Sequence, residues 1–210
     1  MIFPFFLAAS LEVTVDRVVS AFENSTTEIQ YCYIENIHDG RGYTAGKAGF
    51  TSATGDLLEF VKRYRGGLAK YLPELERLAT EESEETKGLR GFVKDYRAEC
   101  QGEEFERAQD DLVDDMYKAP ARDYVKQLHL TSPLAYLIVY DTIIQHGDGD
   151  DPDSFNGILK RMKKETEEVA FLYSFLAERE KVLLHASDPS TRGQNCLYHW
   201  TNRNYKLQSG

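Results

Sequence analysis

The 210-residue chain lacks the features that define several common classes of protein. No stretch approaches the roughly 18 consecutive apolar residues that a membrane-spanning helix needs. Basic residues are in the minority, with 25 Lys and Arg against 35 Asp and Glu and a formal net charge of −10. Nucleic acids and anionic membrane surfaces are bound through basic patches, so neither is expected as a partner. The acidity either serves solubility alone or attracts a cationic ligand.

Cysteine is also scarce, and no cofactor or metal motif is present. The three cysteines, Cys32, Cys100 and Cys196, are widely spaced and form neither a CxxC nor a zinc pattern. This excludes a scaffold built on disulfides and leaves a single bridge open. The histidines show no HExxH spacing, the acidic loop 148–153 does not match an EF-hand, and the GxSxG, P-loop and dinucleotide fingerprints are absent. No cofactor and no metal are therefore expected.

The first ten residues, "MIFPFFLAAS", are apolar but short and without a basic n-region. They are either the remnant of a leader or an apolar first segment that packs against the rest of the chain. The compartment stays open on this evidence.

Hydrophobic spacing predicts a mainly helical chain with a small β element near its start. A helix capped by Thr14 is expected over 14–23, because apolar residues recur at Val15, Val18, Val19 and Phe22. Tyr31, Tyr33 and Glu35 would share one face of a strand. The glycine-rich stretch "HDGRGYTAGKAGF" contains an Asp-Gly hairpin signal, which favours a small antiparallel sheet.

The remaining chain has helical periodicity almost throughout. Thr54-Gly55-Asp56 opens a helix that buries Leu57, Phe60, Val61 and Tyr64. Further helices are predicted near 72–80, 89–100 and 103–117. After a kink at Pro120 another helix runs to about residue 130, and one or two more are expected over 155–184. Ser132-Pro133 begins a helix that is apolar nearly all round, "LAYLIVYDTIIQ", which should be buried and end at His146-Gly147. The last two dozen residues read as irregular.

Two acidic residues lie in contrasting predicted environments. Glu23 ends a helix, where the negative end of the dipole disfavours its ionised form, so it is a plausible proton donor. Asp39 lies in a polar, glycine-rich turn, where it should stay ionised and activate water. Such a pair is what glycoside hydrolysis requires. The alternative is that Glu23 is a surface residue and Asp39 only forms a turn.

Asp141 is the only charged residue in the otherwise apolar helix 133–146. A buried carboxylate must be paired, and Arg179 and Arg192 are its candidate partners. A core ion pair without a functional role is the alternative. The tyrosines Tyr31, Tyr33 and Tyr43 either stack on sugar rings or pack across strands.

Three blocks of the sequence resemble those of a known family. The segment "YCYIENIHDGRGYTAGKAGFTSATGD", with "ENS" before it, resembles the N-terminal signature of the glycoside hydrolase family 46 chitosanases. The stretch "YDTIIQHGDGDDPDSFNGI" is similar to the second family block, and "FLAEREKVLL" followed by "STR" is similar to the third. The resemblance covers most of the chain.

This resemblance implies an α+β, mainly α, lysozyme-like two-lobed fold with a small antiparallel β-sheet beside the substrate cleft. It implies that residues 1–210 form a single catalytic domain, and that this domain hydrolyses the β-1,4 bonds between glucosamine units of chitosan internally. The reaction would invert the anomeric carbon and need no cofactor. A monomer is expected. The family is largely secreted but includes viral members, so an extracellular protein is expected and a viral or intracellular origin stays open.

The resemblance also implies a role for individual residues. Glu23 would be the general acid, Asp39 the general base, and Thr44 would hold the attacking water. The expected substrate-binding residues are Ser25, Tyr33, Arg41, Gly49, Asp56 and His146. Asp141, Arg179 and Arg192 would form an ion-pair network that supports the acid.

Two rival functions remain at this point. A glycosidase of the same fold would act on chitin or peptidoglycan, but an acidic subsite at Asp56 favours free amines over acetamido groups. A polysaccharide-binding domain without catalysis would need no pair such as Glu23 and Asp39.

Overall fold

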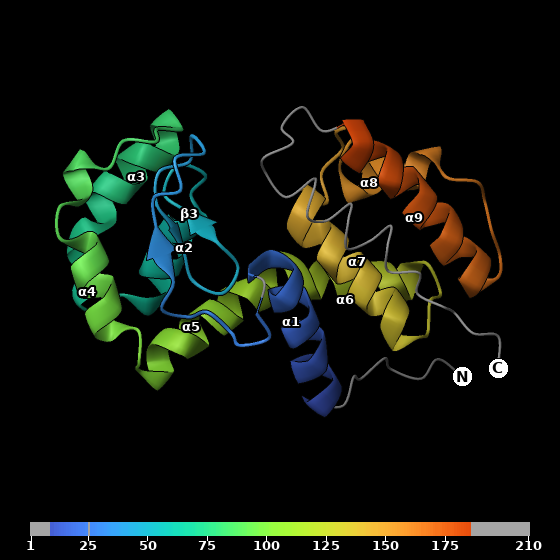
Figure 1. The fold of residues 1–210 in the computed structure, drawn as a ribbon, viewed down its shortest axis with the longest axis horizontal. Coiled ribbons are helices and arrows are strands. Elements are labelled where there is room, and N and C mark those ends of the chain that lie inside the picture. The colour runs from blue at the N-terminus through green and yellow to red at the C-terminus, as the bar shows by residue number, and fades with distance from the viewer. Residues whose placement is uncertain (1–8, 25, 186–210) are drawn as a thin grey trace. The chain divides into compact units, whose positions relative to one another are not determined.

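The computed structural model describes residues 9–24 and 26–185 (Figure 1). The chain groups into two compact units. We call Glu28–Met116 the β unit, and the residues before Glu28 and after Met116 the α unit. The C-terminal segment expected to be irregular lies outside the described residues, as does the apolar N-terminus up to residue 8. Within the described part, no helix is long and apolar enough to cross a membrane.

The β unit contains the small antiparallel sheet that the glycine-rich segment predicts. Its strands β1 (Ile34–Glu35), β2 (Thr44–Ala45) and β3 (Phe50–Thr51) are adjacent in chain order. Thr44 pairs with Glu35 on one side and with Thr51 on the other.

The predicted extent of the first strand is wrong, because Tyr31 and Cys32 form a turn before β1. The backbone oxygen of Tyr31 accepts hydrogen bonds from the side chains of Tyr96 and Gln109 instead of from a strand. The Asp-Gly signal also lies in a longer connection, 36–43, and not in a two-residue turn.

Four α-helices complete the β unit: α2 (Asp56–Tyr64), α3 (Leu72–Glu81), α4 (Phe92–Glu99) and α5 (Glu103–Val113). Short 3-10 turns cover Gly66–Tyr71 and Lys87–Leu89. Helix α2 contacts β3, α3 and α5, and α4 contacts β1 (Figure 1). The predicted buried stripe of α2 is confirmed at Leu57, Phe60 and Val61, whereas Tyr64 is half-buried.

Aromatic rings form the core of the β unit. Phe60 has its ring centroid 4.9 Å from that of Phe105, 5.9 Å from Tyr96 and 6.0 Å from Phe50. All four side chains are 0% exposed. Through Phe50 of β3, the sheet therefore packs on buried aromatic rings contributed by α2, α4 and α5.

The α unit is built from α1 (Ala9–Asn24), α6 (Ala119–Gln127), α7 (Pro133–His146), α8 (Phe155–Arg161) and α9 (Glu168–His185). Helix α7 contacts α1, α6 and α8 (Figure 1). As predicted, α7 is buried, at every residue from Ala135 to Ile143. Ser132 caps it by accepting a hydrogen bond from the backbone N–H of Ala135 at 3.1 Å, and Gly147 follows its end with φ 68°.

Two predicted helix boundaries are wrong. The first helix begins at Ala9, so Thr14 lies inside it and does not cap it. The helix near 103–117 does not simply kink at Pro120: a π-helical turn, Asp114–Lys118, joins α5 to α6, and Pro120 lies in the first turn of α6. Proline is tolerated there because the N–H groups of a first helical turn have no partner within the helix.

Candidate functional site

Asp39 and Arg41 form a close ion pair on the connection between β1 and β2. The backbone N–H of Arg41 donates to Asp39 Oδ1 at 3.1 Å, and its Nε donates to Oδ2 at 2.7 Å. The Nη2 group of Arg41 also donates to Oδ2. Gly40 and Gly42 have φ 84° and 75°, the left-handed region that glycine adopts without strain. These glycines let the loop fold back so that Arg41 reaches the carboxylate two residues before it.

This geometry decides the charge of Asp39, whose side chain is 8% exposed. Burial raises the pKa of the carboxyl, but the hydrogen bonds and positive charge of Arg41 outweigh it, and the pKa lies below its usual value. Asp39 is therefore an ionised carboxylate near neutral pH, as its glycine-rich turn predicts.

Thr44 lies on β2 in the same unit, with 6% of the residue exposed. Its hydroxyl Oγ1 is buried and has no hydrogen-bond partner in the described part of the chain. An unsatisfied buried hydroxyl costs about 1–3 kcal/mol. Such a group is a natural partner for a water molecule or a substrate hydroxyl.

Two further predicted binding residues flank the strands. Tyr33 precedes β1, and its hydroxyl donates to Glu35 Oε2 at 3.4 Å. Burial and then the charge of Glu35 raise the pKa of Tyr33, so its hydroxyl stays protonated. Gly49 lies in the turn between β2 and β3 with φ 69°, and its N–H donates to the Gly46 carbonyl at 3.3 Å. Tyr43 lies 6.4 Å from Phe92, centroid to centroid, so its ring packs within the unit.

Asp56 is the first residue of α2 and connects this helix to the sheet. Its Oδ1 accepts from the backbone N–H of Thr51 at 2.7 Å and from the Thr54 hydroxyl at 2.6 Å. Burial raises the pKa of Asp56, although these hydrogen bonds act in the opposite direction. None of the hydrogen bonds found in the described residues reaches Oδ2. One carboxylate oxygen therefore organises the start of the helix.

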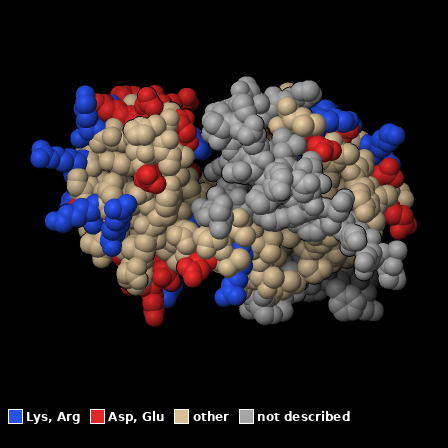
Figure 2. Space-filling model, in the orientation of Figure 1, with Lys and Arg blue, Asp and Glu red and all other residues tan. Residues whose placement is uncertain are grey.

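Figure 2 shows how charged side chains are distributed on one face of the β unit. On the face that Figure 2 shows, the basic side chains of the β unit, the part that holds α2–α5, lie mostly at the left edge, and the acidic ones lie mostly along the upper and lower edges. No single broad negative surface is visible there.

In the α unit, Glu23 lies in the last turn of α1, as the sequence predicts. The structure describes its backbone but not its side chain. Ser25 and Arg192, two other predicted site residues, lie outside the described residues.

The predicted pairing of Asp141 is confirmed for Arg179. The Nη2 group of Arg179 donates to Asp141 Oδ2 at 2.7 Å, and the two side chains are only 2% and 3% exposed. The same Nη2 also donates to Gln145 Oε1. Asp141 and Gln145 lie on α7 and Arg179 lies on α9, so this pair joins two helices inside the core.

His146 is the last residue of α7, five residues after Asp141. Its Nε2 is buried and has no hydrogen-bond partner among the described residues. Desolvation, reinforced by the positive charge of Arg179, lowers the pKa of His146 to about 3. The imidazole is therefore neutral over the ordinary pH range and offers a hydrogen bond without a charge.

Sequence reasoning missed a fully buried polar residue, Gln109 on α5. Its surroundings in "ERAQDDLV" are polar, and glutamine in such a stretch usually lies at the surface. The available signal was its spacing four residues after Phe105, which places it on the apolar face of the helix. No group of side chains suited to a metal ion occurs in the described ranges 9–24 and 26–185.

Comparison with known proteins identifies the family. Residues 17–207 match the family described as glycosyl hydrolase family 46. The chain belongs to glycosyl hydrolase family 46.

Three curated members are named chitosanases. The protein from Bacillus subtilis (strain 168) is 45% identical over 192 residues, which is 85% of this chain and 69% of that protein. The protein from Nocardioides sp. (strain N106) is 42% identical over 184 residues, covering 80% of this chain and 64% of its own length. The protein from Streptomyces sp. (strain N174) is 39% identical over 182 residues, covering 80% of this chain and 65% of its own length. The chain thus spans about two thirds of the length of these relatives.

Solved structures of family 46 confirm the expected fold class. The native chitosanase of Bacillus subtilis MY002 has a TM-score of 0.80 and 41% identity, covering 93% of this chain and 84% of that one. A mutant of that enzyme, with the same scores, is complexed with six GlcN. The Gynuella sunshinyii GH46 chitosanase, in complex with chitotetraose, has a TM-score of 0.79 and 36% identity, covering 94% and 85%.

Proposed function

We propose that this family 46 chain is an endo-acting chitosanase, which hydrolyses β-1,4 bonds between glucosamine units of chitosan. The observation that carries the proposal is the Asp39 carboxylate, which Arg41 keeps ionised on the β1–β2 connection. The chain belongs to glycosyl hydrolase family 46, and the relatives that it resembles in sequence and fold are named chitosanases. Structures of relatives in complex with six GlcN and with chitotetraose support the same substrate class.

Glu23 and Asp39 act as general acid and general base in this proposal. Glu23 protonates the oxygen of the leaving sugar, since the end of a helix favours its protonated form. Asp39 takes a proton from water while that water attacks the anomeric carbon from the opposite face. Thr44, with an unsatisfied buried hydroxyl in the unit that carries Asp39, holds the attacking water. No covalent intermediate forms and the configuration inverts.

Substrate contacts divide into one ionic contact with an ammonium group and several further contacts. Asp56 Oδ2 receives the ammonium group of a glucosamine on the non-reducing side. The remaining proposed contacts come from Ser25, Tyr33, Arg41, Gly49 and His146. Because its pKa is about 3, His146 stays uncharged and does not repel a polycation. Asp141, Arg179 and Arg192 support the acid through their ion pairs.

We also infer the setting in which the enzyme works. It acts outside the cell, as a monomer with one catalytic domain over residues 1–210. It uses no cofactor and binds neither nucleic acid nor membrane. Size-exclusion chromatography with light scattering tests the monomer, and a mass near twice 24.0 kDa would contradict it.

Release of reducing ends from chitosan, compared with chitin and peptidoglycan, tests the activity. Chitosan should be cut fastest, with an early drop in viscosity that marks internal cleavage. Glu23→Gln and Asp39→Asn should each lower kcat by about a hundredfold or more with an unchanged circular dichroism spectrum. Faster cleavage of chitin or peptidoglycan, or binding of chitosan without cleavage, would refute the proposal.

A further inference from the structure

Gln109 is a glutamine with 0% of its surface exposed, on α5 in the β unit. Its Oε1 accepts a hydrogen bond from the backbone N–H of Lys47 at 2.9 Å. Its Nε2 donates to the backbone oxygen of Tyr31 at 3.0 Å and to the hydroxyl of Tyr96 at 3.2 Å. The acceptor and both donor hydrogens of the buried amide are thus engaged, as burial of a polar group requires.

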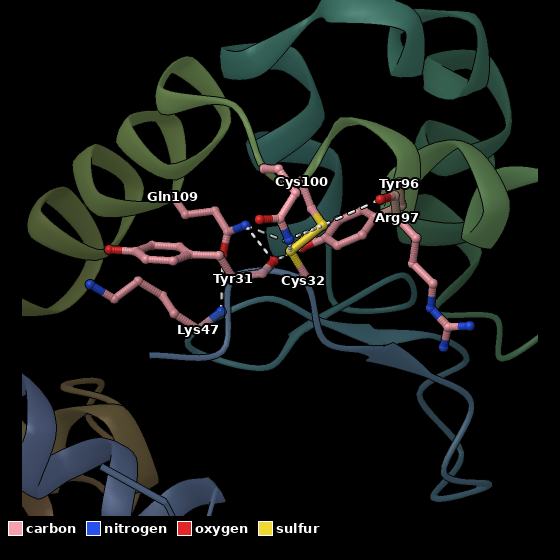
Figure 3. The surroundings of a disulfide bond; sticks show 8 residues. Tyr31, Cys32, Lys47, Tyr96, Arg97, Cys100 and Gln109 are labelled. Atoms are coloured by element: carbon pink, nitrogen blue, oxygen red, sulfur yellow. Dashed lines mark hydrogen bonds between the residues drawn. A yellow bond between two sulfur atoms is a disulfide. The ribbon is translucent and has the colours of Figure 1, made fainter. Parts of the chain in front are cut away.

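Gln109 bonds to two backbone groups, and these lie at the two open ends of one hairpin. Tyr31 comes before β1 and Lys47 comes after β2 (Figure 3). The main-chain ladder between the strands ends with the Gly46 N–H, which donates to the Tyr33 oxygen at 2.8 Å. Beyond that point the Gln109 amide bridges Lys47 and Tyr31. A side-chain amide thereby adds one more bridge to the ladder, in the way a peptide group would.

The close fit around Gln109 shows that this bridge is built into the fold. Gly46 has φ 72°, and a Cβ atom on it would lie 2.4 Å from Gln109 Oε1, so a larger residue would push the amide away. The Tyr96 hydroxyl also donates to the Tyr31 oxygen, at 3.1 Å. Beside Tyr31, the Cys32–Cys100 disulfide connects the same end of the hairpin to the end of α4 (Figure 3).

This hairpin carries the Asp39 and Arg41 pair in its connection and Thr44 in β2. Its strands have two residues each, so the backbone ladder alone gives the connection little support. Catalytic groups must be held within about half an ångström of their working positions, and this precision comes from the residues that support them.

We propose that Gln109 is a positioning residue for the hydrolytic reaction. Its amide holds the two ends of the β1–β2 hairpin together and so sets the placement of Asp39 and Thr44. The inference rests on the roles proposed above for those two residues. The bridge itself can be tested without them.

Gln109→Met tests the bridge, because methionine has a similar length and no amide. The Lys47 backbone N–H should lose its protection against hydrogen exchange. On chitosan, kcat should fall about tenfold or more, since a misplacement of about 1 Å can cost a hundredfold, while KM stays within about twofold. Leu112→Ala is the matched control: Leu112 is a buried residue of α5, 3% exposed. This variant should lower Tm and leave kcat unchanged at a temperature where both variants are folded.

The outcomes separate this inference from the proposed function. A wild-type protein that does not cleave chitosan would refute the function, and Lys47 exchange would still decide whether the bridge exists. If the wild-type protein is active and Gln109→Met has the kcat of Leu112→Ala, Gln109 has no positioning role. If the Lys47 N–H is as well protected against hydrogen exchange in Gln109→Met as in wild type, the bridge does not exist.

Gln109→Glu provides a second readout, which can be used even if Gln109→Met does not fold. The carboxyl keeps an acceptor for the Lys47 N–H but has no donor for the Tyr31 oxygen while it is ionised. Burial raises its pKa, and protonation on acidification restores one donor. The ratio of variant to wild-type kcat should therefore rise as pH falls. A ratio that does not change with pH would contradict the proposal.

Discussion

Arg41 engages both carboxylate oxygens of Asp39: its backbone N–H donates to Oδ1 at 3.1 Å and its guanidinium donates through Nε to Oδ2 at 2.7 Å. The same residue thus orients the proposed base and lowers its pKa. A base with a lowered pKa stays ionised at mildly acidic pH, where the amines of chitosan are largely protonated.

Removal of this guanidinium should shift the pH profile of the enzyme. In Arg41→Met the backbone N–H of residue 41 can still donate to Asp39, but the guanidinium no longer offsets its burial, so the pKa of Asp39 rises and a smaller fraction is ionised at acidic pH. The acidic limb of kcat/KM should move to higher pH, measured on soluble glucosamine oligomers. Arg63→Met is the control, because Arg63 has the same 36% side-chain exposure and pairs with Asp115 at 2.8 Å. An unmoved acidic limb would show that Arg41 does not set the pKa of Asp39.

The ion pair of Asp141 and Arg179 makes a prediction about stability. Asp141→Ala leaves a guanidinium in the core without this carboxylate, which should cost about 3–5 kcal/mol and lower Tm by on the order of 10 °C. Asp150→Ala is the matched control, because Asp150 pairs with Lys160 at 3.0 Å but is 91% exposed. Its Tm should change little. Equal Tm values for the two variants in calorimetry would contradict the structural role of the buried pair.

Asp56 should govern the preference for free amines. Asp56→Asn can keep the Oδ1 hydrogen bonds to Thr51 and Thr54 while it removes the charge, so the fold should persist. KM for chitosan should rise severalfold, and added salt should raise KM less in the variant than in wild type, since the screened attraction is already gone. Glu59→Gln, an exposed carboxylate on the same helix, is the control. An unchanged KM in Asp56→Asn would place the ammonium group elsewhere.

Stereochemistry gives the sharpest test of the proposed mechanism. An inverting enzyme needs its two carboxyl groups about 6.5–9.5 Å apart, to leave room for a water between the base and the sugar. With Asp39 as base, β-linked substrate should release the α anomer first. Proton NMR of fresh products, recorded before mutarotation, would show it. Early β anomer would make Asp39 a nucleophile.

Much of this protein was determined by local sequence. Apolar spacing located α2 and α7, because a helix buries one face or, for α7, nearly every face. Ser132, Pro133 and Gly147 marked the ends of α7, since caps act through their immediate neighbours. The glycine-rich segment indicated a small sheet, and the need to neutralise a buried charge indicated a partner for Asp141. The family blocks named the residues of the candidate site.

Only the tertiary structure decided which distant residues meet. The choice of Arg179 as a partner for Asp141 depends on how α9 packs against α7, which no local pattern encodes. The turn at Tyr31 replaces a strand because side chains from α4 and α5 take its backbone oxygen. The pairing of Cys32 with Cys100 and the burial of Gln109 have the same origin. Contacts between residues far apart in the chain arise from the packing of whole elements, and the local sequence does not record them.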